Sequence, residues 1–239
     1  LRQKILAGRF PRHIERQLRI FFLDHLHGRP IICRSSSELE DLKGASFAGK
    51  YLSEELPNSS DDTEQDFERF LTAIKEIYAS TFNPDVMEYR KVQNLLYKDE
   101  EMGILVQLLN GRQHGKFFYP DLSAVTYSRA TVSTGSNPKE GLLRIGVGLG
   151  ESVVERDEGV VTSLKSPKIR ELKPKRQELI TVLDTETQTK RQMPWKEVIA
   201  QNGLSPAVIS NTIRRYDHES DYWVNCPAND PMAKNGHMD

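Results

Sequence analysis

The sequence predicts an α+β fold, in which a mixed or antiparallel sheet is flanked by helices. Apolar side chains recur at helical spacing over residues 14–26 and again over residues 67–78, which is typical of amphipathic helices. Short apolar runs such as Ile31–Cys33 and Ile104–Val106 have the length of strands. Between residues 115 and 161, apolar runs broken by Gly and Pro indicate a sheet with hairpins.

The first helix is expected to enter after Pro11 and to end before the Gly28–Pro30 segment, which contains two helix breakers. A short buried strand over Pro30–Cys33 follows, and it is expected to end at the polar cluster Arg34–Ser37. Proteins of the α/β class often build their sites where polar groups follow a strand. This cluster is therefore the first candidate site.

A second helix is expected to start at Asp62, because Gln65 follows three positions later as in a capped helix start. It should end before Asn83, with a short helix over 85–96 and a strand over 103–109 behind it. Further strands are predicted over 116–119, 124–127, 142–147, 158–162 and 178–183, and further helices over 195–201 and 207–216. The Lys- and Arg-rich stretch between 165 and 176 reads as a connector.

Composition excludes several classes of protein. The 239 residues include 33 Lys and Arg against 34 Asp and Glu, so the net charge of -1 offers no general attraction to nucleic acid or to an anionic membrane. No apolar run approaches the roughly 20 residues of a membrane span. Two distant cysteines, Cys33 and Cys226, favour a reducing cytoplasm over a disulfide framework. Because the first residue is Leu1, the chain is expected to begin inside a larger protein.

The stretch from Arg34 to Tyr51 carries the functional argument. It combines one arginine, three hydroxyl groups and the small residues Gly44 and Gly49. The planar guanidinium matches phosphate oxygens, and small residues let backbone N–H groups approach an anion. A polar turn, with Arg34 paired to one of the acidic residues 38, 40 or 41, explains the same composition.

The string RSSSELEDLKGASFAGKY at 34–51 resembles the signature of the PEP/pyruvate-binding domain of phosphoenolpyruvate synthase and pyruvate phosphate dikinase, an ATP-grasp type unit. Its matching elements are Arg34–Ser36, Glu40–Asp41 and Ala45–Gly49. Farther along, Ala79–Phe82, Tyr89–Arg90, Val106–Gln107, Phe118–Val125 and Gly148–Val154 are similar to later motifs of that family. The resemblance covers residues 14–168, so we expect an incomplete ATP-grasp-like domain over 1–168 and a C-terminal extension over 169–239.

The resemblance implies that the chain binds ATP and Mg²⁺, with Arg34 as the catalytic and phosphate-binding residue and Ser35 and Ser36 beside it. Glu140 would lie near the nucleotide and the metal ion. In the family, ATP phosphorylates a histidine on a separate domain, of the same or a partner chain, which then passes the group to pyruvate. Phosphoryl transfer depends mainly on positioning and on neutralising charge, so a cation and Mg²⁺ are expected there.

Departures from the family pattern leave an alternative open, a non-catalytic nucleotide-binding or interaction module. A glycine-rich Gly-Gly-Lys segment, a Gln-x-Arg-Pro strand and a Ser-His motif have no counterpart, so the chain alone is expected to be inactive. Ala124 and Arg156–Asp157 replace glycines of the family, and Ala tolerates a positive φ poorly. A third reading treats Trp195–Tyr216 as a DNA-binding helix-turn-helix, but neither the spacing nor the charge favours it.

Overall fold

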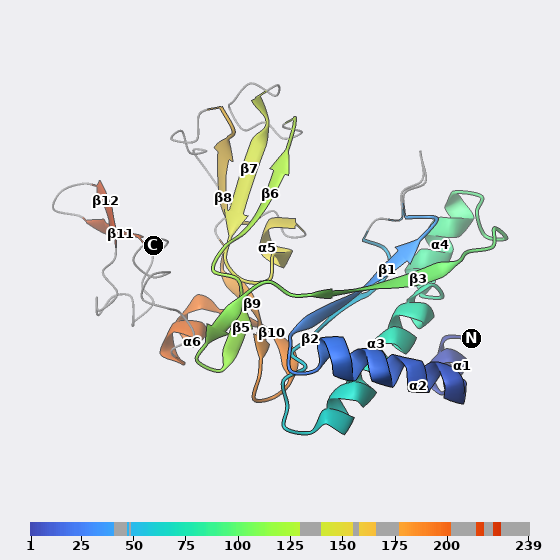
Figure 1. Cartoon of the computed structure of the whole chain (residues 1–239). Coiled ribbons are helices and arrows are strands. Elements are labelled where there is room, and N and C mark those ends of the chain that lie inside the picture. The colour runs from blue at the N-terminus through green and yellow to red at the C-terminus, as the bar shows by residue number, and fades with distance from the viewer. Residues whose placement is uncertain are drawn as a thin grey trace. The chain divides into compact units, whose positions relative to one another are not determined.

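The computed structural model describes residues 1–40, 47, 49–129, 140–154, 158–165 and 177–201, and the backbone of 214–217 and 222–225. These residues form two compact units, each with its own core (Figure 1). Unit 1 comprises residues 1–109 and 185–189, and unit 2 comprises 110–184 and 190–239. The domain boundary expected at residue 168 lies outside the described residues and stays a prediction.

Unit 1 contains a sheet of three antiparallel strands in the order β2-β1-β3. These strands are β1 (Ile31–Ser37), β2 (Ser53–Leu56) and β3 (Met102–Leu108). The prediction that the first strand ends at Cys33 is wrong, because β1 continues through the serines. The neighbouring strand β3 pairs with all three serines, so this polar stretch stays in the sheet despite its composition.

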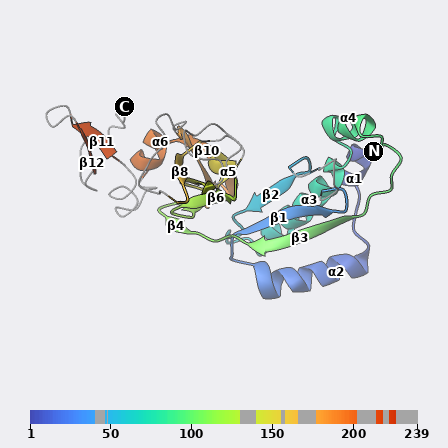
Figure 2. The same ribbon diagram turned by 90° about the horizontal axis from the view of Figure 1, so that it is seen from above.

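Five helical segments accompany this sheet. They are α1 (Arg2–Leu6), α2 (Arg12–Phe21), a turn of π-helix η1 (Phe22–Leu26), α3 (Thr63–Ser80) and α4 (Pro84–Val92). The three helices expected in unit 1 are present, although the one expected over 85–96 ends at Val92, and the segment Arg2–Leu6 was not expected. The helix predicted over 14–26 corresponds to α2 and η1 together. Figure 2 shows α2 and α3 running alongside the strands of the sheet.

The N-terminus of α3 is capped as the sequence predicts. The Asp62 carboxylate accepts a hydrogen bond from the backbone N–H of Gln65 at 3.0 Å, which satisfies one of the free amides of the first turn. The apolar stripe of α3 is buried from Phe67 to Ile77, but Tyr78 at its end is 37% exposed. The helix thus buries one face against the sheet of unit 1.

The core of unit 1 lies between this sheet and its helices. Ile31 and Cys33 project from β1 into a cluster with aromatic side chains of η1 and α3, in which the Phe22 and Phe67 rings are 5.4 Å apart. Burial, with a smaller contribution from the Glu54 carboxylate, raises the pKa of the Cys33 thiol to about 12. Cys33 is therefore an apolar core residue and not a reactive thiolate.

Unit 2 contains a four-stranded sheet in the order β10-β9-β5-β4. Its strands are β4 (Arg112–His114), β5 (Phe117–Tyr119), β9 (Leu179–Asp184) and β10 (Thr189–Pro194), followed by helix α6 (Trp195–Ala200). The core beneath this sheet consists of Phe117, Tyr119, Val147, Ile180, Val182, Met193, Val198 and Ile199. The predicted strand over 178–183 and the predicted helix over 195–201 are confirmed within one residue at each end.

A second sheet of unit 2 has three antiparallel strands in the order β6-β7-β8. They are β6 (Ser123–Tyr127), β7 (Leu142–Gly146) and β8 (Val160–Ser163), accompanied by the short helix α5 (Glu151–Val154). The α+β class with antiparallel sheets and flanking helices is thus confirmed. Among the described helices, none is long and apolar enough to cross a membrane, and the cytoplasmic location stays a prediction.

The C-terminal strands correct one expectation. β11 (Arg214–Asp217) pairs with β12 (Tyr222–Asn225) in an antiparallel hairpin, so the helix predicted over 207–216 is wrong at its last residues. A helix-turn-helix would need that helix to continue to Tyr216, and residues 202–213 lie outside the described part of the chain. The paired strand therefore argues against the helix-turn-helix reading.

Candidate functional site

Arg34 lies in the middle of β1, on the face of the sheet opposite to the core of unit 1. Side chains alternate along a strand, so Ile31 and Cys33 face the core while Arg34 and Ser36 face outward. Arg34 is exposed and lies directly opposite Ser53 on one neighbouring strand and Leu105 on the other. The central strand thus holds the arginine backbone firmly while its side chain remains accessible.

The guanidinium of Arg34 has no ion-pair or hydrogen-bond partner among the described residues. Glu38, one of the carboxylates expected to pair with it in a polar turn, instead lies 3.3 Å from the Lys98 ammonium. Glu40, another, accepts a hydrogen bond from the Ser35 hydroxyl. Asp41, the last of them, lies outside the described residues. Arg34 is therefore an accessible cation, as recognition of an anion requires.

The serines that follow Arg34 do not lie on the same face. Ser36 is exposed and shares the outer face with Arg34, as the alternation of a strand requires. Ser35 lies on the other face, and its hydroxyl donates a hydrogen bond to the Glu40 carboxylate. Of the two serines predicted beside the phosphates, only Ser36 is exposed on the face that carries Arg34, and its role stays a prediction.

A buried polar cluster lies at the end of the sheet where β1 terminates, and no local sequence pattern predicts it. The Glu100 carboxylate accepts hydrogen bonds from the Ser37 and Tyr51 hydroxyls and lies 2.8 Å from Nη1 of Arg90. The side chains of Arg90 and Glu100 are 8% and 4% exposed. Burial, followed by the hydrogen bond to Glu100, raises the pKa of the Tyr51 hydroxyl well above its ordinary value, so Tyr51 remains a donor.

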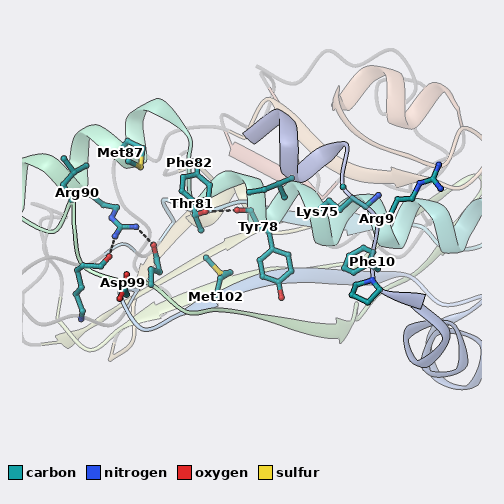
Figure 3. A pocket seen from close by; sticks show the side chains of 16 residues that line it. Arg9, Phe10, Lys75, Tyr78, Thr81, Phe82, Met87, Arg90, Asp99 and Met102 are labelled. Atoms are coloured by element: carbon teal, nitrogen blue, oxygen red, sulfur yellow. Dashed lines mark hydrogen bonds and ion pairs between the residues drawn. The ribbon is translucent and has the colours of Figure 1, made fainter. Parts of the chain in front are cut away.

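The Arg90–Glu100 pair also lines the edge of a cavity of about 640 Å³ in unit 1 (Figure 3). The cavity lies among the N-terminal segment, α3, α4 and the start of β3, and Phe10, Tyr78 and Phe82 give it aromatic walls. Neither Arg34 nor the serines beside it line this cavity. The candidate site on β1 is therefore a feature of the sheet face and separate from this cavity.

Glu140, the predicted metal-binding residue, belongs to unit 2. It directly precedes Gly141 and β7, and its carboxylate accepts a hydrogen bond from the Ser163 hydroxyl at 3.0 Å. Its side chain is half-buried. Arg34 and Glu140 thus lie in different units, and their proximity in a common site stays a prediction.

The Gly148–Gly150 segment, similar to a motif of the predicted family, is a tight turn that leads into α5. Gly148 and Gly150 both have a φ of +93°, which side chains other than glycine rarely adopt. Leu149 N–H donates to the Thr181 carbonyl at 3.0 Å, so the turn is held against β9. This close backbone approach explains why glycine occupies position 148.

One of the two departures from the family pattern, an alanine in place of a glycine, causes no backbone strain in the structure. Ala124 lies in the regular strand β6, opposite Ile145 of β7, and it has no positive φ. An alanine is therefore accommodated without strain at this position. The second departure, at residues 155–157, lies outside the described residues, so it still bears on the non-catalytic alternative.

Comparisons with known proteins agree with the resemblance seen in the sequence. The chain is 35% identical over 151 residues to an uncharacterized phosphotransferase, YvkC, of Bacillus subtilis (strain 168), which covers 63% of the chain and 16% of that protein. It is 30% identical over 159 residues to phosphoenolpyruvate synthase of Pseudomonas aeruginosa (strain UCBPP-PA14), covering 65% of the chain and 18% of that protein. The chain thus matches less than a fifth of each of these relatives.

The sequence profile that describes the pyruvate phosphate dikinase AMP/ATP-binding domain matches residues 1–214. This match includes β1 with Arg34, the α3 and α4 helices, and all the described sheets up to the start of β11. It also extends past residue 168, where the recognisable motifs end. The chain therefore belongs to the family of pyruvate phosphate dikinase AMP/ATP-binding domains.

Proposed function

We propose that the chain is the ATP-binding part of a phosphoenolpyruvate synthase-like phosphotransferase, built as an incomplete ATP-grasp-like unit. The observation that carries this proposal is the accessible Arg34 guanidinium, held on a central strand without a described partner in a family of AMP/ATP-binding domains. Nucleotide binding requires such a cation at a defined position, because the phosphates carry most of the charge of the ligand.

In the proposed site, Arg34 binds phosphate oxygens through its planar fork, and the exposed Ser36 hydroxyl donates to the same group. Arg34 also stabilises the charge that spreads over the transferred phosphoryl group in the transition state. The acceptor is a histidine on a separate domain, of the same or a partner chain, from which the group passes to pyruvate. The described residues supply binding and positioning, and the acceptor comes from elsewhere.

The proposed site also binds Mg²⁺, with Glu140 as the residue that would hold it. When bound, Mg²⁺ would supply positive charge that neutralises part of the charge of the phosphates. Within the described ranges, no three His, Cys, Asp or Glu side chains gather into a protein-only metal site. Magnesium in nucleotide sites is held by one or two carboxylates together with phosphate oxygens, so a single half-buried carboxylate such as Glu140 fits this role.

Calorimetric titration of ATP, with and without Mg²⁺, tests the proposal on the full chain. Arg34→Ala is expected to weaken ATP binding by at least about tenfold, since hydrogen bonds to charged groups contribute about 1.5–3 kcal/mol. Arg16→Ala, which removes an exposed arginine of α2, is the matched control and should leave ATP affinity unchanged. Unaltered affinity in Arg34→Ala would remove Arg34 from the site.

Glu140→Gln tests the metal part of the proposal separately. We expect this variant to lose the Mg²⁺-dependent gain in ATP affinity while it retains the affinity measured without Mg²⁺. A chain that binds ATP without any Mg²⁺-dependent gain in affinity would favour the alternative, a non-catalytic nucleotide-binding module. A chain that binds no nucleotide at all would leave only an interaction module.

A further inference from the structure

One buried carboxylate connects the end of β1 with the segments that lead into β2 and β3, three residues along the chain from Arg34. Ser37 is the last residue of β1, and Glu100 lies two positions before β3 begins at Met102. Tyr51 lies two positions before β2 begins at Ser53. Because the strands are antiparallel, these three positions meet at one end of the sheet.

The Glu100 carboxylate accepts hydrogen bonds from the last residue of β1 and from the segment that leads into β2. One of its oxygens accepts from the Ser37 and Tyr51 hydroxyls, and the other accepts from Arg90 of α4. Ser37 is three residues from Arg34, and Tyr51 is two residues from Ser53, the register partner of Arg34. Two hydrogen bonds to the Glu100 carboxylate thus hold the chain close to Arg34 on β1 and close to its partner on β2.

All three guanidinium nitrogens of Arg90 donate hydrogen bonds within this arrangement. Its Nε donates to the Leu95 carbonyl at 3.2 Å, and its Nη2 donates to the Lys98 carbonyl. It therefore holds the turn that precedes Glu100 as well as the carboxylate itself. Figure 3 shows the Arg90 guanidinium directed at this turn, and its contacts to Glu100 and Lys98 appear as dashed lines.

From these contacts we propose that Glu100 is a positioning residue for nucleotide phosphates, one that acts through Ser37 and Tyr51 to hold the outward-facing Arg34 and Ser36 in a binding geometry. The inference rests on the proposed function, because it concerns the same phosphate site. Glu100 itself is buried beneath the sheet end and does not contact the ligand. Fixing an arginine in advance strengthens its binding, since less side-chain and backbone freedom is lost with the ligand.

The test uses the partners of Glu100, because a Glu100 variant would leave the buried Arg90 cation unpaired and would destabilise unit 1 as a whole. Tyr51→Phe removes one hydroxyl and leaves the ring in place. Thr81→Val is the matched control, because it removes a buried hydroxyl that donates to the Tyr78 carbonyl at 2.7 Å, at the C-terminal cap of α3. Both variants should have similar unfolding midpoints in urea.

Tyr51→Phe is expected to weaken ATP binding about threefold to tenfold, the effect of one lost hydrogen bond, whereas Thr81→Val keeps the wild-type affinity. The same substitution is then combined with Arg34→Lys, which keeps a cation and loses the planar fork. If the hydroxyl acts by positioning Arg34, its effect on ATP affinity shrinks in the Arg34→Lys background. If Tyr51→Phe instead loosened the whole fold, it would weaken ATP binding by the same factor in the wild-type and the Arg34→Lys chains.

The outcomes separate the two proposals. A wild-type chain that binds no ATP overturns the proposed function, and the positioning role with it. If Arg34→Ala loses ATP affinity while Tyr51→Phe retains it, only the positioning role is overturned. The same holds if the effects of Tyr51→Phe and Arg34→Lys on ATP affinity are additive. Weaker binding in Tyr51→Phe, with coupling to position 34, supports it.

Discussion

Both units bury large side chains, but they differ in how tightly the main chain is packed at their glycines. Unit 1 fills the space under its sheet with large side chains, and Phe22, Phe67 and Phe70 are each at most 1% exposed. Unit 2 depends at key turns on residues that have no side chain. A Cβ at Gly148 would lie 2.6 Å from the Thr181 carbonyl oxygen, and one at Gly159 would lie 2.2 Å from that of Ile145. Unit 1 should therefore be most sensitive to lost volume and unit 2 to added volume.

The largest effect is expected from Phe67→Ala in unit 1. Removing a fully buried ring leaves a cavity between α3 and η1 and should reduce the free energy of unfolding by about 3–5 kcal/mol. Urea denaturation followed by hydrogen exchange of unit 1 amides measures it. Leu23→Ala, at a side chain of η1 that is 48% exposed, is the control and should cost far less. A loss under 1 kcal/mol for Phe67→Ala would contradict the comparison.

Gly159→Ala should produce the next largest effect, in unit 2. The φ of Gly159 is +109°, and the new Cβ would collide with main-chain atoms that cannot move aside like a flexible side chain. Strain and crowding together should cost about 2–4 kcal/mol. Gly28→Ala is the control, because its φ is +72° with nothing within 4 Å, and it should cost only about 1–2 kcal/mol. Equal losses in the two variants would show that crowding plays no part.

Glu151→Gln tests an electrostatic contribution that belongs to unit 2. Burial acts to raise the pKa of this carboxyl, but hydrogen bonds from Lys190 and Gln192 outweigh it and hold the pKa below its ordinary value. A lowered folded-state pKa adds stability above the unfolded-state pKa of about 4.3, and this stability is lost as pH falls through the folded-state value.

Glu151→Gln should therefore cost about 1–2 kcal/mol at pH 7, and less as the pH falls below about 4. Urea midpoints of wild type and variant across this range give the difference directly. Glu197→Gln on α6, at an exposed carboxylate, is the control and should leave the urea midpoint at pH 7 nearly unchanged. A difference that stays constant with pH would mean that the carboxylate charge adds nothing to the stability of unit 2.

The smallest effect is expected at Leu105, on the outer face of the unit 1 sheet. This side chain is 48% exposed and lies directly opposite Arg34, so Leu105→Ala should change the free energy of unfolding by no more than about 0.5 kcal/mol. The same urea measurement as for Phe67→Ala checks it. A loss above about 2 kcal/mol would mean that the outer face contributes to the core.

The main helices and most strands could be predicted from the sequence because their apolar residues repeat with a clear period. The α3 stripe and the β3 run are examples, and both lie within two residues of their expected ends. The end of β1 could not be predicted, because serines occupy both faces after Cys33 and hide the alternation. The edge strand β2, with the sequence SEEL, has a polar composition and was missed for the same reason.

The candidate site likewise has one part that the sequence predicts and another that it does not. Arg34 could be found from a local motif, since the arginine and its serines are adjacent in the chain. The Glu100 cluster could not, because Ser37 and Glu100 are 63 positions apart and Glu100 stands in no recognisable pattern. Tyr89–Arg90 was noticed only as part of the resemblance. Such long-range polar contacts depend on the pairing of strands, which no local period reveals.

The pairing register of β1 has a consequence for how this domain can change during evolution. Inserting one residue between Cys33 and Arg34 would turn either the arginine toward the core or the thiol toward the outer face, because neighbouring side chains point to opposite faces. A change of two residues would preserve the faces but shift Arg34 along the strand. Length changes should therefore accumulate in the loops of unit 1 and be excluded from this strand.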